Sequence, residues 1–232
     1  MKKMLVIALA ALFVCSCQQI EGLMNSAKGG EEKPAEGSSS SNSSAKSNYD
    51  PKASLKAFVM SDIKAAYVDP AKAAVGSSAT RDMGNNNKMT VAVVGEMNGN
   101  KVVELTGSYM KDYASNTPAV VAMEVDKMGK VLKAWGGLVG TDGVELPVPA
   151  PPKPMEGSGE KMDYKTKELG SETIVGFSAK GVETTTKHGS SKAWTNMDFP
   201  YFSGVLKTEA AGAKIVVSEY MKSGAKAQLK IK

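Results

Sequence analysis

From Met89 onward, apolar side chains recur at every second residue of this sequence, and this period constrains the fold more than any other feature. Met89, Val91 and Val93 alternate with their neighbours, which is the pattern of a β-strand with one buried face. Asn98-Gly99 then supplies a residue pair favoured in two-residue hairpin turns, and a second run continues over residues 102–110. The sequence therefore predicts antiparallel β-structure.

Similar runs continue to the end of the sequence, separated by turn residues. They predict strands over residues 119–125, 130–136, 172–177, 182–187, 192–197, 204–209, 214–221 and 225–232. In the last run, apolar residues such as Leu229 and Ile231 alternate with lysine and glutamine, so this strand should be buried on one face only. We expect about nine antiparallel strands in a single large curved sheet, similar to half of a barrel.

One helix is expected before the strands. Asp50 provides an N-cap and Pro51 the proline favoured at the first helical position. Apolar side chains then recur at helical spacing as far as Tyr67. The predicted fold class is α+β, mainly antiparallel β, with one amphipathic helix over residues 51–67 packed on the sheet. A single β-rich domain over residues 50–232 would contain both.

A segment rich in proline interrupts the strands at residues 147–154. Proline lacks the N–H that a sheet interior requires, so this segment is predicted to run outside the sheet as a long loop. The large aromatic side chains are instead expected in or beside the core. They are Trp135, Phe177, Trp194, Phe199, Tyr201 and Phe202.

Residues 1–16 have the organisation of a secretion signal. Lys2 and Lys3 precede an apolar run over residues 4–14 that is too short to span a bilayer. Two cysteines, Cys15 and Cys17, follow this run, and the small residue Ser16 comes directly before Cys17. The stretch from Val14 to Cys17 resembles the lipobox of bacterial lipoproteins. We predict acylation of Cys17, with Cys15 as the alternative, and thereby attachment to the membrane through a covalent lipid such as palmitate.

Residues 17–49 are predicted to be the lipidated cysteine and a disordered tether. The segment is rich in serine and glycine and carries hardly any apolar side chain after Ser26, so it cannot offset its own ordering entropy. Gln18 rather than aspartate comes after Cys17, which resembles the sorting pattern of enterobacterial outer-membrane lipoproteins. The expected location is the bacterial cell envelope, anchored to the outer membrane on its periplasmic or surface face.

Composition narrows the range of functions. The net charge of +5 is a weak bias, and every basic residue except Arg81 is lysine. Arginine is the residue expected for bidentate recognition of phosphate or guanine, so the lysines indicate a solvated coat and no nucleic-acid partner is expected. No cysteine occurs after Cys17, which excludes a disulfide scaffold in the folded part.

No reactive constellation stands out in the sequence. The single histidine, His188, lies in a predicted turn; Ser190 or Ser191 as nucleophile and Asp163 or Asp198 as orienting acid would be needed beside it. We expect no catalytic residue, no metal and no cofactor. An envelope enzyme with a carboxylate-based site formed by distant strands is the alternative.

Methionines are numerous, and two interpretations remain open for them. They fill irregular core space, or they line an adaptable apolar cavity in the sheet. The positions concerned are Met83, Met89, Met97, Met110, Met123, Met128, Met155, Met162, Met197 and Met221.

Several stretches resemble a group of exported bacterial β-sheet lipoproteins of unknown function. In that group a tryptophan strand is followed by a proline turn and a glycine-hydrophobic-lysine strand, as in 193–195 and 199–209 here. The other matching stretches are 74–76, 88–95, 172–180 and 223–225. The expected architecture is also similar to half-barrel carriers of the LolA and LppX type, which implies a concavity able to hold an acyl chain.

These observations together predict a membrane-anchored envelope lipoprotein. Its domain would act as a non-catalytic binding or interaction module, with an apolar, lipid-like ligand in the sheet concavity or an envelope protein as candidate partners.

Overall fold

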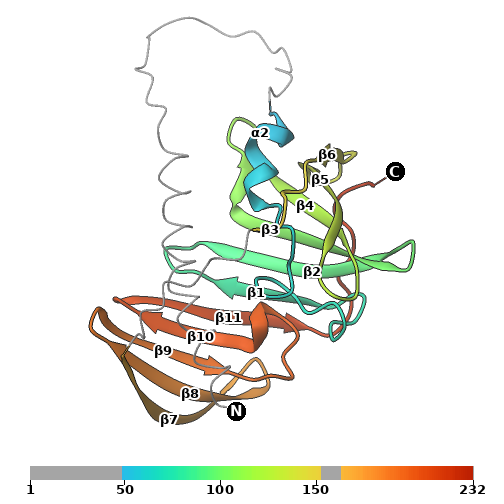
Figure 1. Cartoon of the computed structure of the whole chain (residues 1–232). Helices are drawn as coiled ribbons and strands as arrows, with labels where there is room; N and C mark the ends of the chain where they lie inside the picture. Colours follow the sequence, from blue (N-terminus) through green and yellow to red (C-terminus); the bar gives the residue numbers. More distant parts are fainter. Residues whose placement is uncertain (1–48, 153–162, 232) are drawn as a thin grey trace, which may run out of the picture. The chain divides into compact units, whose positions relative to one another are not determined.

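The computed structural model describes residues 49–152 and 163–231, whose eleven strands form one antiparallel sheet (Figure 1). The strands lie in the order β6-β5-β4-β3-β2-β1-β11-β10-β9-β8-β7. Two meanders, β1 to β6 and β7 to β11, are therefore joined where β1 pairs with β11. The sheet is open, because β6 and β7 lie at opposite edges. The prediction of a mainly antiparallel protein built on one large sheet is confirmed.

The strands of the first meander are β1 (Ser78–Asp82), β2 (Lys88–Met97), β3 (Asn100–Asp112), β4 (Thr117–Val125), β5 (Val131–Leu138) and β6 (Val144–Leu146). Those of the second are β7 (Tyr164–Ile174), β8 (Phe177–Thr186), β9 (Gly189–Thr195), β10 (Val205–Ala210) and β11 (Ala213–Met221). The helices of the described residues are short: α2 (Pro51–Leu55), η1 (Lys56–Phe58) and η2 (Phe202–Gly204).

Most hairpins lie where the sequence predicts them. Asn98 and Gly99 join β2 to β3 and both have positive φ, as the favoured two-residue turn requires. One predicted boundary is wrong, because the turn between β7 and β8 is Val175-Gly176 and not a segment near residue 180. Val175 has a φ of 43°, a conformation that β-branched residues rarely adopt, so its side chain gave no turn signal.

The prediction of a helix over residues 51–67 is wrong beyond its first turns. Asp50 does cap α2 through the N–H of Lys52, at 2.9 Å. After η1, however, the chain binds to the turn between β4 and β5, where the N–H of Ile63 donates to the carbonyl of Gly129 at 2.9 Å. These hydrogen bonds to another element replace those that a continuing helix would make, so tertiary contacts override the helical spacing.

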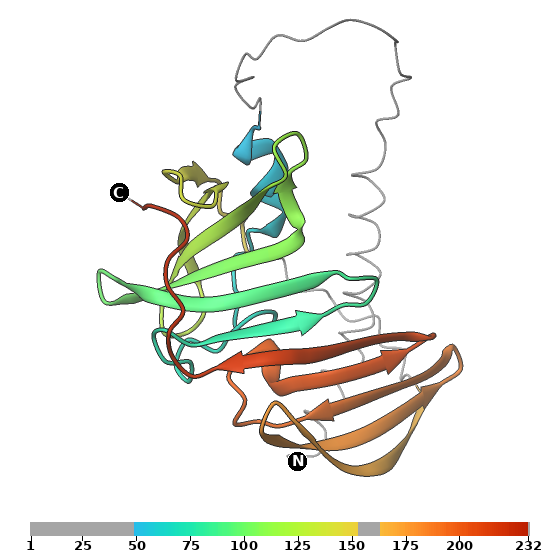
Figure 2. The same ribbon diagram turned by 180° about the vertical axis from the view of Figure 1, so that it is seen from behind.

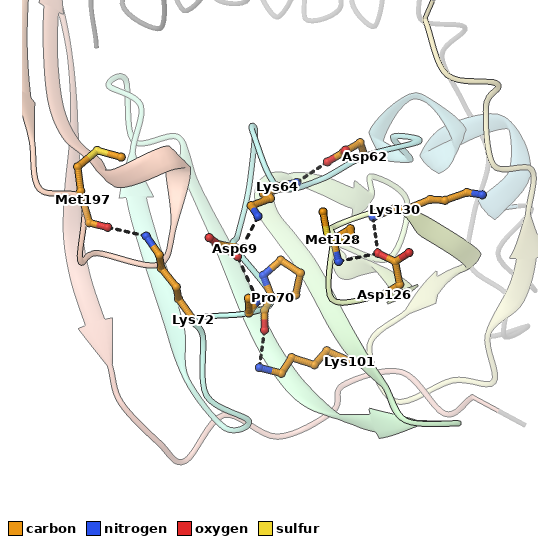
Figure 3. Close-up of polar contacts among 11 residues, drawn as sticks. Asp62, Lys64, Asp69, Pro70, Lys72, Lys101, Asp126, Met128, Lys130 and Met197 are labelled. Atoms are coloured by element: carbon orange, nitrogen blue, oxygen red, sulfur yellow. Dashed lines mark hydrogen bonds and ion pairs between the residues drawn. The ribbon is translucent and has the colours of Figure 1, made fainter. Parts of the chain in front are cut away.

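Residues 49–77, here called the N-terminal segment, cover one face of the sheet, which we call the inner face. The segment is held by polar contacts along its length (Figure 3). Lys101 of β3 donates to the carbonyl of Pro70 at 2.6 Å, and Lys72 donates to the carbonyl of Met197 at 2.7 Å. The hydroxyl of Ser203 donates to the carbonyl of Ala65 at 2.5 Å. Lys72 and Lys101, which the sequence predicts to be solvated surface residues, thus also hold the N-terminal segment in place.

The main core lies between the N-terminal segment and the inner face. Buried Leu55, Val59, Ile63 and Val68 from the segment pack in one cluster with the strands. The strand side chains of that cluster include Val91, Val93, Val103, Leu105, Val121, Met123, Leu206, Trp194 and Val217. Alternate residues of each strand supply them, as the period-two pattern predicts.

The aromatic side chains lie in or beside the core as predicted. Phe199, Tyr201 and Phe202 are fully buried, and Phe177 packs edge-on to Phe199 with ring centroids 5.1 Å apart. Trp194 belongs to the main core, whereas Trp135 belongs to a second cluster on the opposite, outer face. The methionines divide: Met89, Met110 and Met123 are buried in the core, and Met128, Met197 and Met221 are exposed. The first three fill core space.

The predicted last strand, residues 225–232, is wrong in the part that the structure describes. Residues 222–231, here called the C-terminal segment, cross the outer face as irregular chain (Figure 2). Leu229 is buried there against Val120, Ala122 and Trp135. The carboxylate of buried Glu104 accepts the N–H of Gln228 at 2.9 Å and that of Leu229 at 3.0 Å. The segment also bonds to the loop between β5 and β6, where the N–H of Gly140 donates to the carbonyl of Gln228 at 2.7 Å and the N–H of Lys230 donates to that of Thr141 at 3.0 Å. A carboxylate and a loop, and not a neighbouring strand of the sheet, satisfy this backbone.

Pro147 to Pro152 form no strand, in agreement with the prediction of a segment outside the sheet. The rest of that proline segment, like the predicted signal peptide, Cys17 and the tether up to residue 48, lies outside the described residues. Tyr49, predicted as the end of the tether, is instead partly buried and packs against the main core.

Glu104→Ala should lower the free energy of unfolding by about 1–3 kcal/mol, because two backbone N–H groups lose their acceptor. Burial raises the pKa of Glu104, and the hydrogen bonds from Gln228 and Leu229 only partly oppose this. The folded protein then binds more protons than the unfolded chain above pH 4.5, so wild-type stability falls as the pH rises through the raised pKa. The cost of the substitution should therefore be larger at about pH 4 than at about pH 7.

Urea denaturation at the two pH values measures this effect. Glu96→Ala, an exposed carboxylate on β2, is the matched control and should change stability by less than about 0.5 kcal/mol. A cost for Glu104→Ala that rises with pH over this range would contradict the assigned direction.

Candidate functional site

A row of alternating charge crosses the five strands of the second meander. Its members lie directly opposite one another in the register from β7 to β11. They are Lys167, Glu183, Lys192, Glu209 and Lys214. Opposite charges on neighbouring strands stabilise an antiparallel sheet modestly. We call these five residues the charged row.

The charged row lies on the inner face. Lys192 and Trp194 are two residues apart on β9 and therefore point to the same face, and Trp194 belongs to the inner core. Glu183, Lys192 and Glu209 are half-buried, whereas Lys167 and Lys214 at the two ends are exposed. The inner face thus changes from an apolar surface, covered by the N-terminal segment, to a charged one.

Lys207 of β10 links the charged row to the core. Its ammonium pairs with Glu172 at 2.9 Å and with Glu209 at 3.2 Å, and it lies 4.0 Å from the ring centroid of Trp194. Burial lowers the pKa of Lys207, but the hydrogen bonds and negative charges of Glu172 and Glu209 outweigh burial and raise it. This lysine is therefore held in its charged form by its neighbours.

A shallow, open pocket of about 350 Å³ lies over the middle of the charged row. Glu183, Ser190 and Lys192 form one side, and the turn between β10 and β11 with Glu209 and Lys214 forms the other. The hydroxyl of Ser190 donates to the carboxylate of Glu183 at 2.9 Å. Small residues of the turn, Ala210 to Ala213, leave the backbone accessible. Such a surface offers charges of both signs close together.

A second open pocket, of about 260 Å³, lies at the other end of the sheet beside β5 and β6. Tyr49, Pro51, Leu138 and Asp142 contribute to its lining. Tyr49 and Pro51 belong to the start of the N-terminal segment, so the pocket lies between that segment and the sheet edge. The described residues that line the pocket include no histidine, cysteine or lysine.

The structure does not assemble the catalytic residues considered from sequence. His188 is exposed in the turn between β8 and β9, where its backbone N–H donates to the hydroxyl of Thr186. The register brings Asp163, which precedes β7, to the same end of the sheet. No hydrogen bond within the described residues joins His188, Ser190 and Asp163. Asp198 lies beyond the other end of β9.

The charged row could not be recognised from the sequence alone. Each member belongs to a short strand with ordinary alternation, and the row exists only in the register between strands. A signal was nevertheless present, because Glu183, Lys192, Glu209 and Lys214 occupy polar positions in four of the predicted strands. The shift of the β7–β8 turn also had to be known before Lys167 could be added.

The chain matches no protein-family model and no curated protein sequence. Within residues 49–152 and 163–231, no helix is long and apolar enough to cross a lipid bilayer. The same part of the chain contains no cluster of three or more His, Cys, Asp or Glu side chains placed to hold a metal ion. A function for the domain has therefore to be inferred from the geometry of the charged row.

Lys207→Met should lower the free energy of unfolding by about 1–2 kcal/mol at neutral pH, because two carboxylates lose their shared cation. Methionine keeps the aliphatic contact with Trp194, so the loss reports on charge. For the wild type, this stabilisation is fully present below the unfolded-state pKa of 10.5 and is lost as the pH rises through the raised folded-state pKa.

Denaturant melts at neutral pH and above pH 10.5 test this prediction. Lys192→Met, on the same face but without an ion pair within 4.0 Å among the described residues, is the control and should cost less than about 0.5 kcal/mol. Equal losses for the two substitutions would show that Lys207 is not the special cation.

Proposed function

We propose that this protein is a lipid-anchored lipoprotein of the bacterial envelope whose β-domain is a non-catalytic interaction module. Two independent features support the proposal. The signal-like residues 1–16 with Cys17 support export and acylation, and the charged row with its open pocket supplies an accessible surface of defined chemistry.

The charged row is the observation that carries the interaction role. Its lysines and glutamates alternate at the spacing of neighbouring strands, about 4.8 Å, so a complementary partner would present alternating charges or a zwitterionic group. Electrostatic complementarity of this kind selects a partner and its orientation more than it adds affinity. A polar segment of an envelope protein fits this surface best.

An apolar ligand in the sheet concavity would need a different state of the domain. In the described residues, the inner face under β1 to β5 is packed against the apolar side chains of the N-terminal segment. An acyl chain would have to displace Leu55, Ile63 and their neighbours to reach the sheet. The proposed ligand class is therefore polar.

Cys17→Ala should release the protein from membranes, because the acyl chains that supply the binding energy are lost. Detergent-phase partitioning of the wild type and the variant measures this: the wild type should enter the detergent phase and the variant the aqueous phase. Cys15→Ala is the matched control and should still partition with detergent. Equal aqueous recovery of the wild type and Cys17→Ala would overturn the lipoprotein assignment.

Site-specific photo-cross-linking in intact envelopes tests the interaction role. A photoreactive side chain in place of Lys192 should give an adduct whose yield falls at high salt, because exposed charges are screened. The same group at exposed Lys222, outside the charged row, should not give that adduct. Organic extraction of the purified full chain tests the apolar ligand. Co-purified lipid with no adduct specific to the Lys192 position would replace the polar proposal by the carrier one.

A further inference from the structure

β7 is a long and accessible edge of the sheet. It contains eleven residues, Tyr164–Ile174, and all but Leu169 and Ile174 are exposed. Within the described part of the chain, only β8 pairs with it. The outer row of its backbone N–H and C=O groups is therefore open to another strand. The opposite edge, β6, has only three residues.

The charges of β7 are complementary to those of a second copy of β7 that runs antiparallel to it. Lys165, Lys167 and Glu168 precede the Leu169–Gly170 bond at the centre of the strand, and Glu172 follows it. When two copies of such a strand run antiparallel about that bond, Lys167 of each copy lies opposite Glu172 of the other. An edge protected only by like charges would not have this property.

A β-bulge fixes the centre of this pattern. The register with β8 shifts between Glu168 and Gly170, so Leu169 is the extra residue, and it packs against the inner core. Gly170 pairs with Gly181, and Glu172 bonds to Lys207, which places both on the inner face as well. The inner-face residues of β7 are thus Lys165, Lys167, Leu169, Gly170, Glu172 and Ile174.

This set is symmetric about the bond between Leu169 and Gly170. Antiparallel pairing of two copies about that point puts Lys167 opposite Glu172 twice, Thr166 opposite Thr173 twice, and no like charges opposite one another. A shift by two residues in one direction would set Glu168, on the outer face, against Leu169. A shift in the other direction would set Ser171 against Gly170. Because directly opposite residues must share a face, these two shifts are excluded. Pairing about Thr166 would keep the faces matched but would set Lys165 opposite Lys167, a pair of like charges.

We propose that two copies of this chain associate through antiparallel pairing of their β7 strands about the Leu169–Gly170 bond. The interface is isologous, as in most homodimers, and joins the two sheets into one. Glu172 of each copy then lies between its own Lys207, at 2.9 Å, and Lys167 of the second copy. The row of alternating charge continues across the dimer. This inference does not depend on the lipid anchor.

Disulfide trapping tests the register in the full chain, purified in detergent. In the double variant T166C/T173C, the cysteine at position 166 of each copy lies opposite the cysteine at position 173 of the other copy. Their Cα atoms would be about 4.5–5.5 Å apart, a separation that a disulfide can bridge. Mild oxidation should give a covalent dimer. The single variants T166C and T173C are the controls: like positions lie about seven residues apart along the strand, about 23 Å, so they should give only background shared with natural Cys15 and Cys17.

Charge reversal tests the energetic basis by sedimentation equilibrium. K167E should raise the dimer dissociation constant about tenfold or more, because it creates two like-charge pairs. The double variant K167E/E172K should dimerise more tightly than K167E, because the glutamate at position 167 then faces the lysine at position 172 of the second copy; the rescue is partial, because E172K also removes the ion pair with Lys207. Lys167 makes no ion pair within 4.0 Å in the described residues, but K167E sets a glutamate opposite Glu183 of the same copy. Urea melts therefore accompany the measurement, and the K167E dimer must weaken while its domain remains folded.

Three outcomes would overturn the proposal. They are a wild type that stays monomeric up to about 100 µM, a T166C/T173C cross-link no stronger than that of the single variants, and a dimer that K167E leaves unchanged.

Discussion

The pairing of β1 with β11 holds the two meanders together, and it depends on a strand with little apolar surface of its own. β1 has the sequence Ser-Ala-Thr-Arg-Asp, yet its first four residues are buried because neighbours lie on both sides. Arg81, the only arginine, stacks on Phe202 at 3.9 Å and donates to the carbonyl of Val205 at 3.2 Å. A buried guanidinium held in this way ties the centre of the sheet to the start of β10.

Two irregular segments complete the burial that the sheet alone cannot provide. The N-terminal segment covers the inner face with apolar side chains and is held by lysine-to-carbonyl hydrogen bonds such as that from Lys101 to Pro70. The C-terminal segment covers part of the outer face, held by Glu104. Both use long side chains from the strands to satisfy backbone groups that have no strand to pair with. Strands of the first meander are thereby covered on both faces.

The period-two pattern was sufficient to predict the fold class and most hairpins, because alternation and turn residues are local properties. It failed where partners distant in sequence decide the structure. Residues 56–67 have helical spacing but bond to Gly129, and residues 225–231 alternate like a strand but bond to Glu104. The charged row was beyond prediction for the same reason, since it depends on the register of five strands. Neither Cys17 nor residues 18–48 of the tether lie in the described residues, so those predictions stay predictions.

The two halves of the sheet differ in what covers their inner face, and this difference favours one end for binding. Under the first meander, the N-terminal segment leaves apolar residues buried at 0% exposure, as for Val121 and Met123. Among the described residues, no segment extends over the far end of the second meander, where Glu183, Lys192 and Glu209 stand in place of apolar side chains. Because these residues are charged, this part of the inner face can be exposed to water without a covering segment. A partner can therefore bind there without first unfolding part of the domain. An interaction surface at this end therefore leaves the core intact, whereas one under the N-terminal segment would require that segment to be displaced.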